Sequence, residues 1–524
     1  MHIVVLNIVI IMILIIVALL LAIYLYGRRT FNYWKVRNVK HDKPIFLVGT
    51  NLKNYLLQQN ITQQAENVYW KYPNEKVVGF YRGWRPELVI RDPEIVKRIL
   101  TSDFSYFNNR GLNQHEKVET LLQSLFFVEG DLWRLLRQRS TAAFTTSKLK
   151  SMFPLLEKCM EQLKVRITSK AINNVSVFDA HDLMARFTTD FICASGFNIE
   201  TDALKNDDSQ FRKLGKRIFT SYIRDLAVIV LKDVLPEISG KLLTFDSNIE
   251  KFFNSLIKNI TNIKNQEPSD RKDFVDLLME YNQKGPMTGN SIEKLKPDGT
   301  PEVVTKVMDE KLMAAQAFIY FAAGFETSAI ATSFALHELA YNPLVQRKVQ
   351  DDIDSVLLKH NNKLTYEAIK EMKYLECTLK ESLRMFPPLG FISRKCTSKY
   401  TFPELNLEID KGVAVIIPVK ALQNDPLYFE NPEEFRPERF LSQEFEIKNK
   451  YVFLPFGEGP RSCIGNRLGL MQSMAGLAAV LSCFTVEPAS STVRNPVVDP
   501  VSNLSHATAI LWLHQERVRF GVCL

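Results

Sequence analysis

The chain has 524 residues, 46% of them hydrophobic, and a formal net charge of +8, so it is long enough to bury a large core. The positive charge is concentrated near the amino terminus, where residues 28–43 contain six basic residues and one acid and account for +5 of the +8. The rest of the chain is close to neutral, so no nucleic-acid partner is expected. The seven cysteines show no C-x-x-C spacing, which excludes the common zinc clips.

The amino-terminal segment is typical of a membrane anchor. From Ile3 to Tyr26 it carries no charge, and Asn7 is its one strongly polar residue. About 20 apolar residues suffice to span a bilayer, and here the basic residues follow the apolar run. That order favours a signal anchor over a cleavable signal peptide and leaves the remaining chain in the cytosol. We therefore predict a transmembrane anchor over 1–27, a basic juxtamembrane linker over 28–43 and one large domain over 44–524.

The residues after the linker predict a short mixed region and then a long helical one. Residues 76–81 and 86–90 predict a hairpin that turns at Arg82-Gly83, and Asp92-Pro93 predicts a helix start. Helical patterns dominate from about residue 115 to about residue 390, apart from a polar break over 282–300. Strands, loops and one further helix complete the chain. The predicted fold class is mainly α with small β-sheets.

Two helical stretches bear on function. A run of about forty residues from Glu302 to Tyr341 stops at Asn342-Pro343 and predicts a central helix that crosses the whole domain. Residues 210–238 mix basic side chains, among them Arg212, Lys213, Lys216, Arg217 and Arg224, with the apolar run 226–231. They favour a buried helix, and a second membrane-contacting surface that helps lipophilic molecules to enter is the open alternative.

The strongest chemical signal is the stretch Phe456-Gly457-Glu458-Gly459-Pro460-Arg461-Ser462-Cys463-Ile464-Gly465. It places one cysteine in a glycine-rich loop directly before an apolar, helix-like run. Peptide N–H groups in such a loop, and the start of the helix, favour a deprotonated Cys463 that can bind a metal. Arg461 adds positive charge that suits an anionic group on a cofactor. The alternative, a buried cysteine in a turn, fits a lone cysteine better than it fits the full pattern.

This loop resembles the haem-thiolate signature of the cytochrome P-450 superfamily. The resemblance implies that Cys463 is the axial ligand of the iron of haem b. A second motif, Ala323-Gly324-Phe325-Glu326-Thr327, lies in the long helix and resembles the A-G-x-(D/E)-T of the superfamily. In the superfamily it lines the side of the haem opposite the cysteine. Thr327 is therefore implied to hydrogen-bond to dioxygen, and Glu326 to relay protons.

The other motifs occur in the same order as in the superfamily. Glu381 and Arg384 lie one helical turn apart and precede Arg439, and by resemblance the three form a buried network that braces the haem region. Trp133 and Arg137 lie on one predicted helical face, and the resemblance makes them partners of the haem propionates. The implied haem-binding residues are Trp133, Arg137, Arg394, Phe456, Arg461 and Cys463.

The resemblance implies a membrane-bound monooxygenase that inserts one oxygen atom of O2 into lipophilic molecules, either xenobiotics or endogenous lipids and hormones. Because no flavin motif is present, electrons from NADPH are expected through a separate NADPH-cytochrome P-450 reductase, with cytochrome b5 as a second candidate donor. The anchor implies a single-pass protein of the endoplasmic reticulum membrane with its catalytic domain in the cytosol. The residues in and around these motifs are most similar to those of the arthropod microsomal branch associated with detoxification.

Two other functions stay open from the sequence. A haem-thiolate isomerase or dehydratase would rearrange peroxides without a reductase, although such relatives often lack the acid–alcohol pair that Glu326 and Thr327 form here. A non-enzymatic haem or lipophile binder is the third function. The residues expected to line a pocket, around 104–127, 210–238 and 389–393, are apolar and do not identify the substrate.

Overall fold

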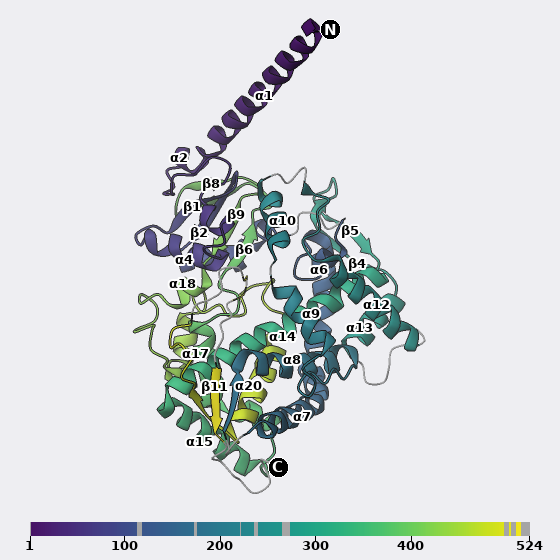
Figure 1. The fold of residues 1–524 in the computed structure, drawn as a ribbon, viewed down its shortest axis with the longest axis vertical. Helices are drawn as coiled ribbons and strands as arrows, with labels where there is room; N and C mark the ends of the chain where they lie inside the picture. The colour runs from purple at the N-terminus through teal and green to yellow at the C-terminus, as the bar shows by residue number, and fades with distance from the viewer. Residues whose placement is uncertain are drawn as a thin grey trace.

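The centre of the molecule is a 32-residue helix, α14 (Glu310–Tyr341), which other helices surround (Figure 1). Asp309 fixes its start, because its carboxylate accepts a hydrogen bond from the backbone N–H of Leu312 at 2.8 Å. Its end precedes Asn342-Pro343, since the residue before a proline is disfavoured in a helix. The predicted central helix is thereby confirmed from residue 310 onward.

The structure is a computed structural model that describes residues 2–112, 118–171, 175–220, 222–234, 239–264, 273–496, 502, 504 and 510–514. Most of these residues are helical, and the strands form small sheets, so the predicted fold class is confirmed. Parts of the ranges expected to line a pocket, namely 113–117, 221 and 235–238, lie outside the described residues.

The helices differ widely in length. The longer helices besides α14 are α1 (His2–Thr30), α4 (Ile61–Lys71), α6 (Gly130–Ser140), α7 (Thr146–Ser169), α8 (Ala180–Phe197), α9 (Gln210–Phe219), α10 (Ile223–Val234), α12 (Ser247–Ile263), α13 (Phe274–Gln283), α15 (Pro343–Lys359), α17 (Lys373–Met385) and α20 (Asn466–Leu481). The short ones are α2 (Tyr33–Val36), α3 (Leu52–Tyr55), α5 (Pro93–Lys97), α16 (Tyr366–Glu371), α18 (Val419–Gln423) and α19 (Gln443–Lys448). The 3-10 segments are η2 (Phe104–Tyr106), η3 (Thr120–Gln123), η4 (Thr141–Phe144) and η5 (Pro437–Leu441), and η1 (Arg98–Ser102) is a π-helical turn.

Within the described residues, the strands form four small sheets. The largest has the order β1 (Val77–Arg82), β2 (Arg85–Ile90), β9 (Ala414–Ile417), β6 (Ile392–Lys395). A second sheet has the order β10 (Thr485–Pro488), β11 (Ile510–His514), β3 (Val175–Asp179), and β7 (Tyr400–Phe402) pairs with β8 (Leu407–Ile409). Strands β1 and β2 are antiparallel with Val78 opposite Val89, which confirms the predicted hairpin.

A hairpin replaces the first part of the predicted central helix. Strands β4 (Met287–Leu295) and β5 (Pro301–Lys306) pair antiparallel, so the expectation of a helix from Glu302 is wrong. The run Val303-Val304-Thr305 is β-branched, and β-branched side chains favour strands. Asp298-Gly299 supplies the turn, in which Gly299 has a φ of +82°. The polar break predicted over 282–300 therefore contains one strand and the turn of this hairpin.

Helix α1 projects away from the body of the molecule (Figure 1). Its side chains Leu6, Ile11 and Leu14 are more than half exposed. Among the residues that the structure describes, α14 has the length and hydropathy of a membrane span, and 78% of its apolar stretch is buried inside the protein. Helix α14 is therefore a core helix, and membrane attachment through α1 stays a prediction.

The basic segment after α1 packs on the main sheet. Trp34 of α2 is fully buried, and its indole Nε1 donates a hydrogen bond to the carbonyl of Phe80 at 3.0 Å. Arg37 forms an ion pair with Asp410 at 2.8 Å. Part of the segment that the sequence predicts as a linker thus contributes to the core.

The described part of 210–238 forms two helices, α9 and α10, so the expectation of one buried helix is wrong. Arg212 and Gly215 of α9 are buried. In contrast, Tyr222 before α10 and Leu231 within it are 54% and 42% exposed. Contact of this region with a membrane stays a prediction.

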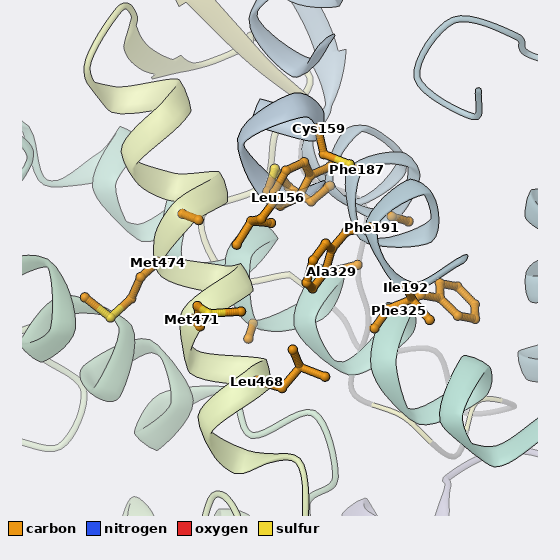
Figure 2. Packing of buried hydrophobic residues seen from close by; sticks show 14 of the residues in the cluster. Leu156, Cys159, Phe187, Phe191, Ile192, Phe325, Ala329, Leu468, Met471 and Met474 are labelled. Atoms are coloured by element: carbon orange, nitrogen blue, oxygen red, sulfur yellow. The ribbon is translucent and has the colours of Figure 1, made fainter. Parts of the chain in front are cut away.

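The largest hydrophobic cluster joins α7, α8, α14 and α20. Figure 2 shows Leu156 of α7, Phe187 of α8, Ala329 of α14 and Met471 of α20 in this cluster. A second cluster surrounds the main sheet and contains Trp34. Because α20 follows directly on the cysteine loop, the packing of the first cluster fixes that loop relative to α14.

Candidate functional site

The loop around Cys463 is a tight, internally bonded turn. The backbone N–H of Cys463 donates to the carbonyl of Phe456 at 2.8 Å, and that of Ser462 donates to Gly459 at 3.0 Å. Gly459 has a φ of +76°, and a Cβ there would lie 1.8 Å from the carbonyl oxygen of Leu100. Only glycine fits this position. The turn therefore holds Cys463 three residues before the start of α20.

Cys463 is exposed, whereas the other described cysteines are all buried. Even so, enough protein surrounds the sulfur for burial to raise the pKa of the Cys463 thiol above its ordinary value. A backbone hydrogen bond from Gly465 and the charges of Arg110 and Arg137 lower this pKa, but by less. The backbone donor thus favours the thiolate as predicted, but burial outweighs it. A metal cation on the sulfur would reverse the balance, since a coordinating thiol loses its proton.

One stripe of α14 is open while the rest of the helix is buried. Between Leu312 and Ala340 the residues that are not buried are Ile319, Ala323, Gly324 and Thr327. Ile319, Ala323 and Thr327 are four residues apart and so share one helical face. The hydroxyl of Thr327 donates to the carbonyl of Ala323 at 2.7 Å. This face contains the predicted catalytic Thr327 and can accommodate a ligand beside the helix.

Glu326 is directed away from this stripe. It is 5% exposed, and its Oε1 lies 2.9 Å from Nε2 of His181 at the start of α8. Glu326 and Thr327 are thus neighbours in sequence that contact different parts of the molecule. No local pattern indicates His181, because the contact joins residues 145 positions apart. A role of Glu326 and Thr327 in proton transfer stays a prediction.

Four guanidinium groups gather near the cysteine loop. Arg137 Nη1 donates to the carbonyl of Ser462 at 2.7 Å. Arg461 Nε donates to Asn108 at 2.7 Å, and its guanidinium carbon lies 4.1 Å from the ring centroid of Trp133. Arg110, which the sequence did not single out, donates through Nη2 to the carbonyl of Arg461 at 3.1 Å.

Arg394, on β6, belongs to the same cluster. It is 2% exposed, and its Nη1 donates to the carbonyl of Ser393 at 2.8 Å. The charge of Arg110 acts on it. The structure thus brings together the predicted Trp133, Arg137, Arg394 and Arg461.

Too little negative charge surrounds this arginine cluster (Arg110, Arg137, Arg394 and Arg461) to balance it. None of its members forms an ion pair with a carboxylate among the described residues. Burial, and then the charges of Arg110 and Arg394, lower the pKa of Arg461 to about 8, and burial lowers the pKa of Arg110 to about 10. Three nitrogens, Nε of Arg110, Nε of Arg394 and Nη2 of Arg461, are buried without a hydrogen-bond partner among the described residues. The cluster therefore has the donors and charge to bind an anion with more than one carboxylate.

The predicted bracing network is confirmed. Arg384 forms a bidentate pair with Glu381 at 2.8 and 2.9 Å, and Arg439 Nε donates to Glu381 at 3.2 Å. All three residues are buried. Phe456 contributes through its backbone carbonyl, which binds the N–H of Cys463, and through its ring, which is partly buried against the main helical cluster.

Comparisons with known proteins agree with this arrangement. A sequence model of the family described as Cytochrome P450 matches residues 40–511. Cytochrome P450 6B2 of Helicoverpa armigera is 36% identical over 481 residues, which cover 92% of this chain and 93% of that protein. Cytochrome P450 6a2 of Drosophila melanogaster is 36% identical over 505 residues, covering 95% and 97%. Cytochrome P450 6B1 of Papilio polyxenes is 35% identical over 483 residues, covering 91% and 94%.

These relatives are all insect proteins, so the predicted similarity to the arthropod branch is confirmed. The match extends over nearly the whole chain and includes the cysteine loop, the central helix and the arginine cluster. The chain therefore belongs to the cytochrome P450 family of haem monooxygenases.

Proposed function

We propose that this chain is a membrane-bound monooxygenase that holds haem b through Cys463 and oxidises lipophilic molecules with electrons delivered by a separate reductase. The observation that carries the proposal is the arginine cluster, with Arg394 and Arg461 buried, beside an exposed cysteine. Two propionates would supply the negative charge that Arg110, Arg394 and Arg461 need. When bound, the haem supplies the redox-active iron that activates dioxygen.

The residues around the site have separable tasks. Cys463 would bind the iron, and Arg137 would hold the cysteine loop through its hydrogen bond to Ser462. Trp133 covers the guanidinium of Arg461 and so fixes its plane. Phe456 would pack beside the bound group, and its carbonyl keeps Cys463 in place.

Thr327 would supply the hydroxyl at the site of oxygen chemistry. Its proton is held by the carbonyl of Ala323, which leaves the oxygen lone pairs on the open stripe. Glu326 and His181 offer a second pair of proton-exchanging groups one residue away. Proton transfer would then pass from this pair toward Thr327 through water.

Helix α1 would anchor the enzyme in the endoplasmic reticulum membrane, with the catalytic domain in the cytosol. Its 29 residues reach about 43 Å, which exceeds the hydrocarbon core of about 30 Å. The basic residues Arg28 and Arg29 end the helix on the cytosolic side. An NADPH-cytochrome P-450 reductase, assisted by cytochrome b5, would supply the electrons.

The proposed substrates are lipophilic, because the open stripe of α14 presents Ile319 and Ala323 beside Thr327. Xenobiotics are the first class that we propose, and endogenous lipids or hormones are the second. A panel of both classes, scored by product per NADPH consumed, distinguishes them.

The carbon monoxide difference spectrum of the reduced full-length protein tests the proposal. The wild-type protein should give the band of a thiolate-ligated haem, and Cys463→Ser should lose it. The matched control is Cys483→Ser, at a buried cysteine beyond the opposite end of α20, and this variant should keep the band. A thiolate band that survives Cys463→Ser would contradict the assignment of the ligand.

A further inference from the structure

Helix α20 makes polar contacts, through Gln472, with the turn of α14 that contains Gly324. Gln472 is 1% exposed, and its Nε2 donates a hydrogen bond to the carbonyl of Gly324 at 2.6 Å. The same nitrogen also donates to the hydroxyl of Ser328. Gly324 and Ser328 are one helical turn apart, and Thr327 lies between them. The amide of Gln472 therefore spans the turn of α14 that presents Thr327.

The orientation of this amide is determined by its partner. A backbone carbonyl only accepts hydrogen bonds, so the NH2 group of Gln472 must face Gly324. This leaves Oε1 of Gln472 buried, with no donor among the described residues. Figure 2 shows the neighbouring Leu468, Met471 and Met474 of α20 among the side chains of the hydrophobic cluster. A buried acceptor without a partner destabilises a fold, so stability alone does not explain a glutamine here.

The position along the chain indicates what the glutamine does. Helix α20 starts directly after the loop that holds Cys463, and the packing of α20 on α7 and α8 makes it rigid. Gly324 is the residue of α14 with the least intrinsic helix preference in this turn. A donor from α20 on its carbonyl therefore ties the weakest turn of α14 to the element that carries the cysteine.

We propose that Gln472 is a positioning residue that sets the height and tilt of the Thr327 turn relative to Cys463. This inference rests on the proposed monooxygenase function, in which Thr327 and Cys463 act on opposite sides of the bound group. Through Gly324 and Ser328, Gln472 holds the carbonyl of Ala323 and hence the hydroxyl of Thr327 in register. Its role is to keep proton delivery coupled to oxidation of the substrate.

The test compares Gln472→Met with a matched control, Gln346→Met, in the full-length haem-loaded protein. Methionine keeps the length and volume of glutamine while removing the donor. Gln346 is also buried, and its Nε2 donates to Leu339 of α14 at 3.1 Å and to Val486 at 2.9 Å. Leu339 is 15 residues from Gly324, about 22 Å along the helix. Both variants thus lose buried bonds to α14, but only one loses them at the site.

Two readouts are measured on each variant. Hydrogen exchange of the amides over 325–330 should become about fivefold faster in Gln472→Met, since one net hydrogen bond is lost there, and should stay unchanged in Gln346→Met. Peroxide released per NADPH consumed should rise at least twofold in Gln472→Met alone, with the thiolate band retained. If Gln472→Met does not fold, Ser328→Ala, which removes one end of the contact, should show the same two changes to a smaller degree.

Equal exchange and equal peroxide release in the two methionine variants would overturn the inference. If the wild-type protein shows no thiolate band and no oxygenated product, the proposed function fails instead. The exchange experiment would then still decide whether Gln472 holds this turn of α14.

Discussion

At the scale of single residues, the site is defined by arginines that form no ion pair with a carboxylate in the part of the chain that the structure describes. Burial and the neighbouring Arg110 and Arg394 lower the pKa of Arg461 to about 8. A dianion that binds between these groups would restore the charge of Arg461 and the hydrogen bonds of the three unpaired nitrogens. The arginine cluster thus couples the stability of the domain to binding of its cofactor.

This coupling predicts an unusual pH dependence for the protein without haem. Between about pH 8 and the ordinary pKa of arginine, the unfolded state binds more protons at Arg461 than the folded state does, so stability rises with pH. Between pH 8 and 9 the Arg461 contribution to the free energy of unfolding should increase by about 1 kcal/mol. The measurement is urea unfolding at both pH values for wild type and Arg461→Met, whose difference isolates this group. The haem-loaded protein should lack the effect, and a slope that persists in Arg461→Met would contradict the assignment.

Thr327 carries the second prediction at this scale. Thr327→Ala removes a hydroxyl whose proton is already bound to Ala323, so the free energy of unfolding should change by less than about 0.5 kcal/mol. Product per NADPH should nevertheless fall about tenfold or more, with peroxide released instead, because a positioned hydroxyl that would accept and pass on protons is lost. Thr332→Ala removes the same kind of bond, to Ser328 at 2.7 Å, on a buried face of α14 and should leave coupling unchanged. Unchanged coupling in Thr327→Ala would exclude the role.

At the scale of elements, the β4–β5 hairpin holds the helix that carries Trp133 and Arg137. Asp131, in the first turn of α6, accepts hydrogen bonds from Ser291 Oγ at 2.8 Å and from the N–H of Ile292 at 2.6 Å. Asp131 is buried, so these bonds are shielded from water. The hairpin therefore fixes the start of α6 beside the arginine cluster.

Asp131→Ala should loosen this attachment and leave the N–H of Ile292 without a partner. We expect a loss of about 2 kcal/mol in the free energy of unfolding and faster transfer of haem to apomyoglobin. Asp298→Ala, in the exposed turn of the same hairpin, is the matched control and should change neither quantity appreciably. Equal haem loss from the two variants would show that the hairpin does not position α6.

The sequence predicts those elements whose determining residues lie close together in the chain, and it misses those that depend on contacts between distant residues. The cysteine loop and the β1–β2 hairpin follow from local patterns, and both are confirmed. Arg110 and His181 have no local signal, because they reach the site through contacts 351 and 145 residues apart. The β4–β5 hairpin was missed because polar residues interrupt its alternation, and the apolar residue Val303 on it is exposed. Burial, which no local pattern reveals, also raises the pKa of Cys463 by more than the local donors lower it.

At the scale of the whole molecule, the catalytic body and α1 are joined near the main sheet rather than near the cysteine loop. Helix α1 leaves the body beside β1 and β2 (Figure 1). Gly27 lies against Trp84, and the ring of Phe31 stacks on Trp84 with centroids 6.1 Å apart. A membrane that held α1 would therefore lie near the β1–β2 turn, at the same end as α10 with its exposed Leu231 (Figure 1).

This arrangement predicts the effect of removing the anchor. Deletion of residues 2–23 keeps Tyr24, Gly27, Phe31 and Trp34, so the thermal midpoint of unfolding should be unchanged. Turnover supported by a membrane-bound reductase should fall at least tenfold, because the two proteins lose their shared surface and hence their high effective concentration. A scrambled apolar helix of equal length should restore it, since the anchor acts through hydrophobicity alone. Flotation with lipid vesicles measures attachment directly. A deletion variant that still floats would assign membrane binding to the α10 end, and Leu231→Lys in that variant should then release it.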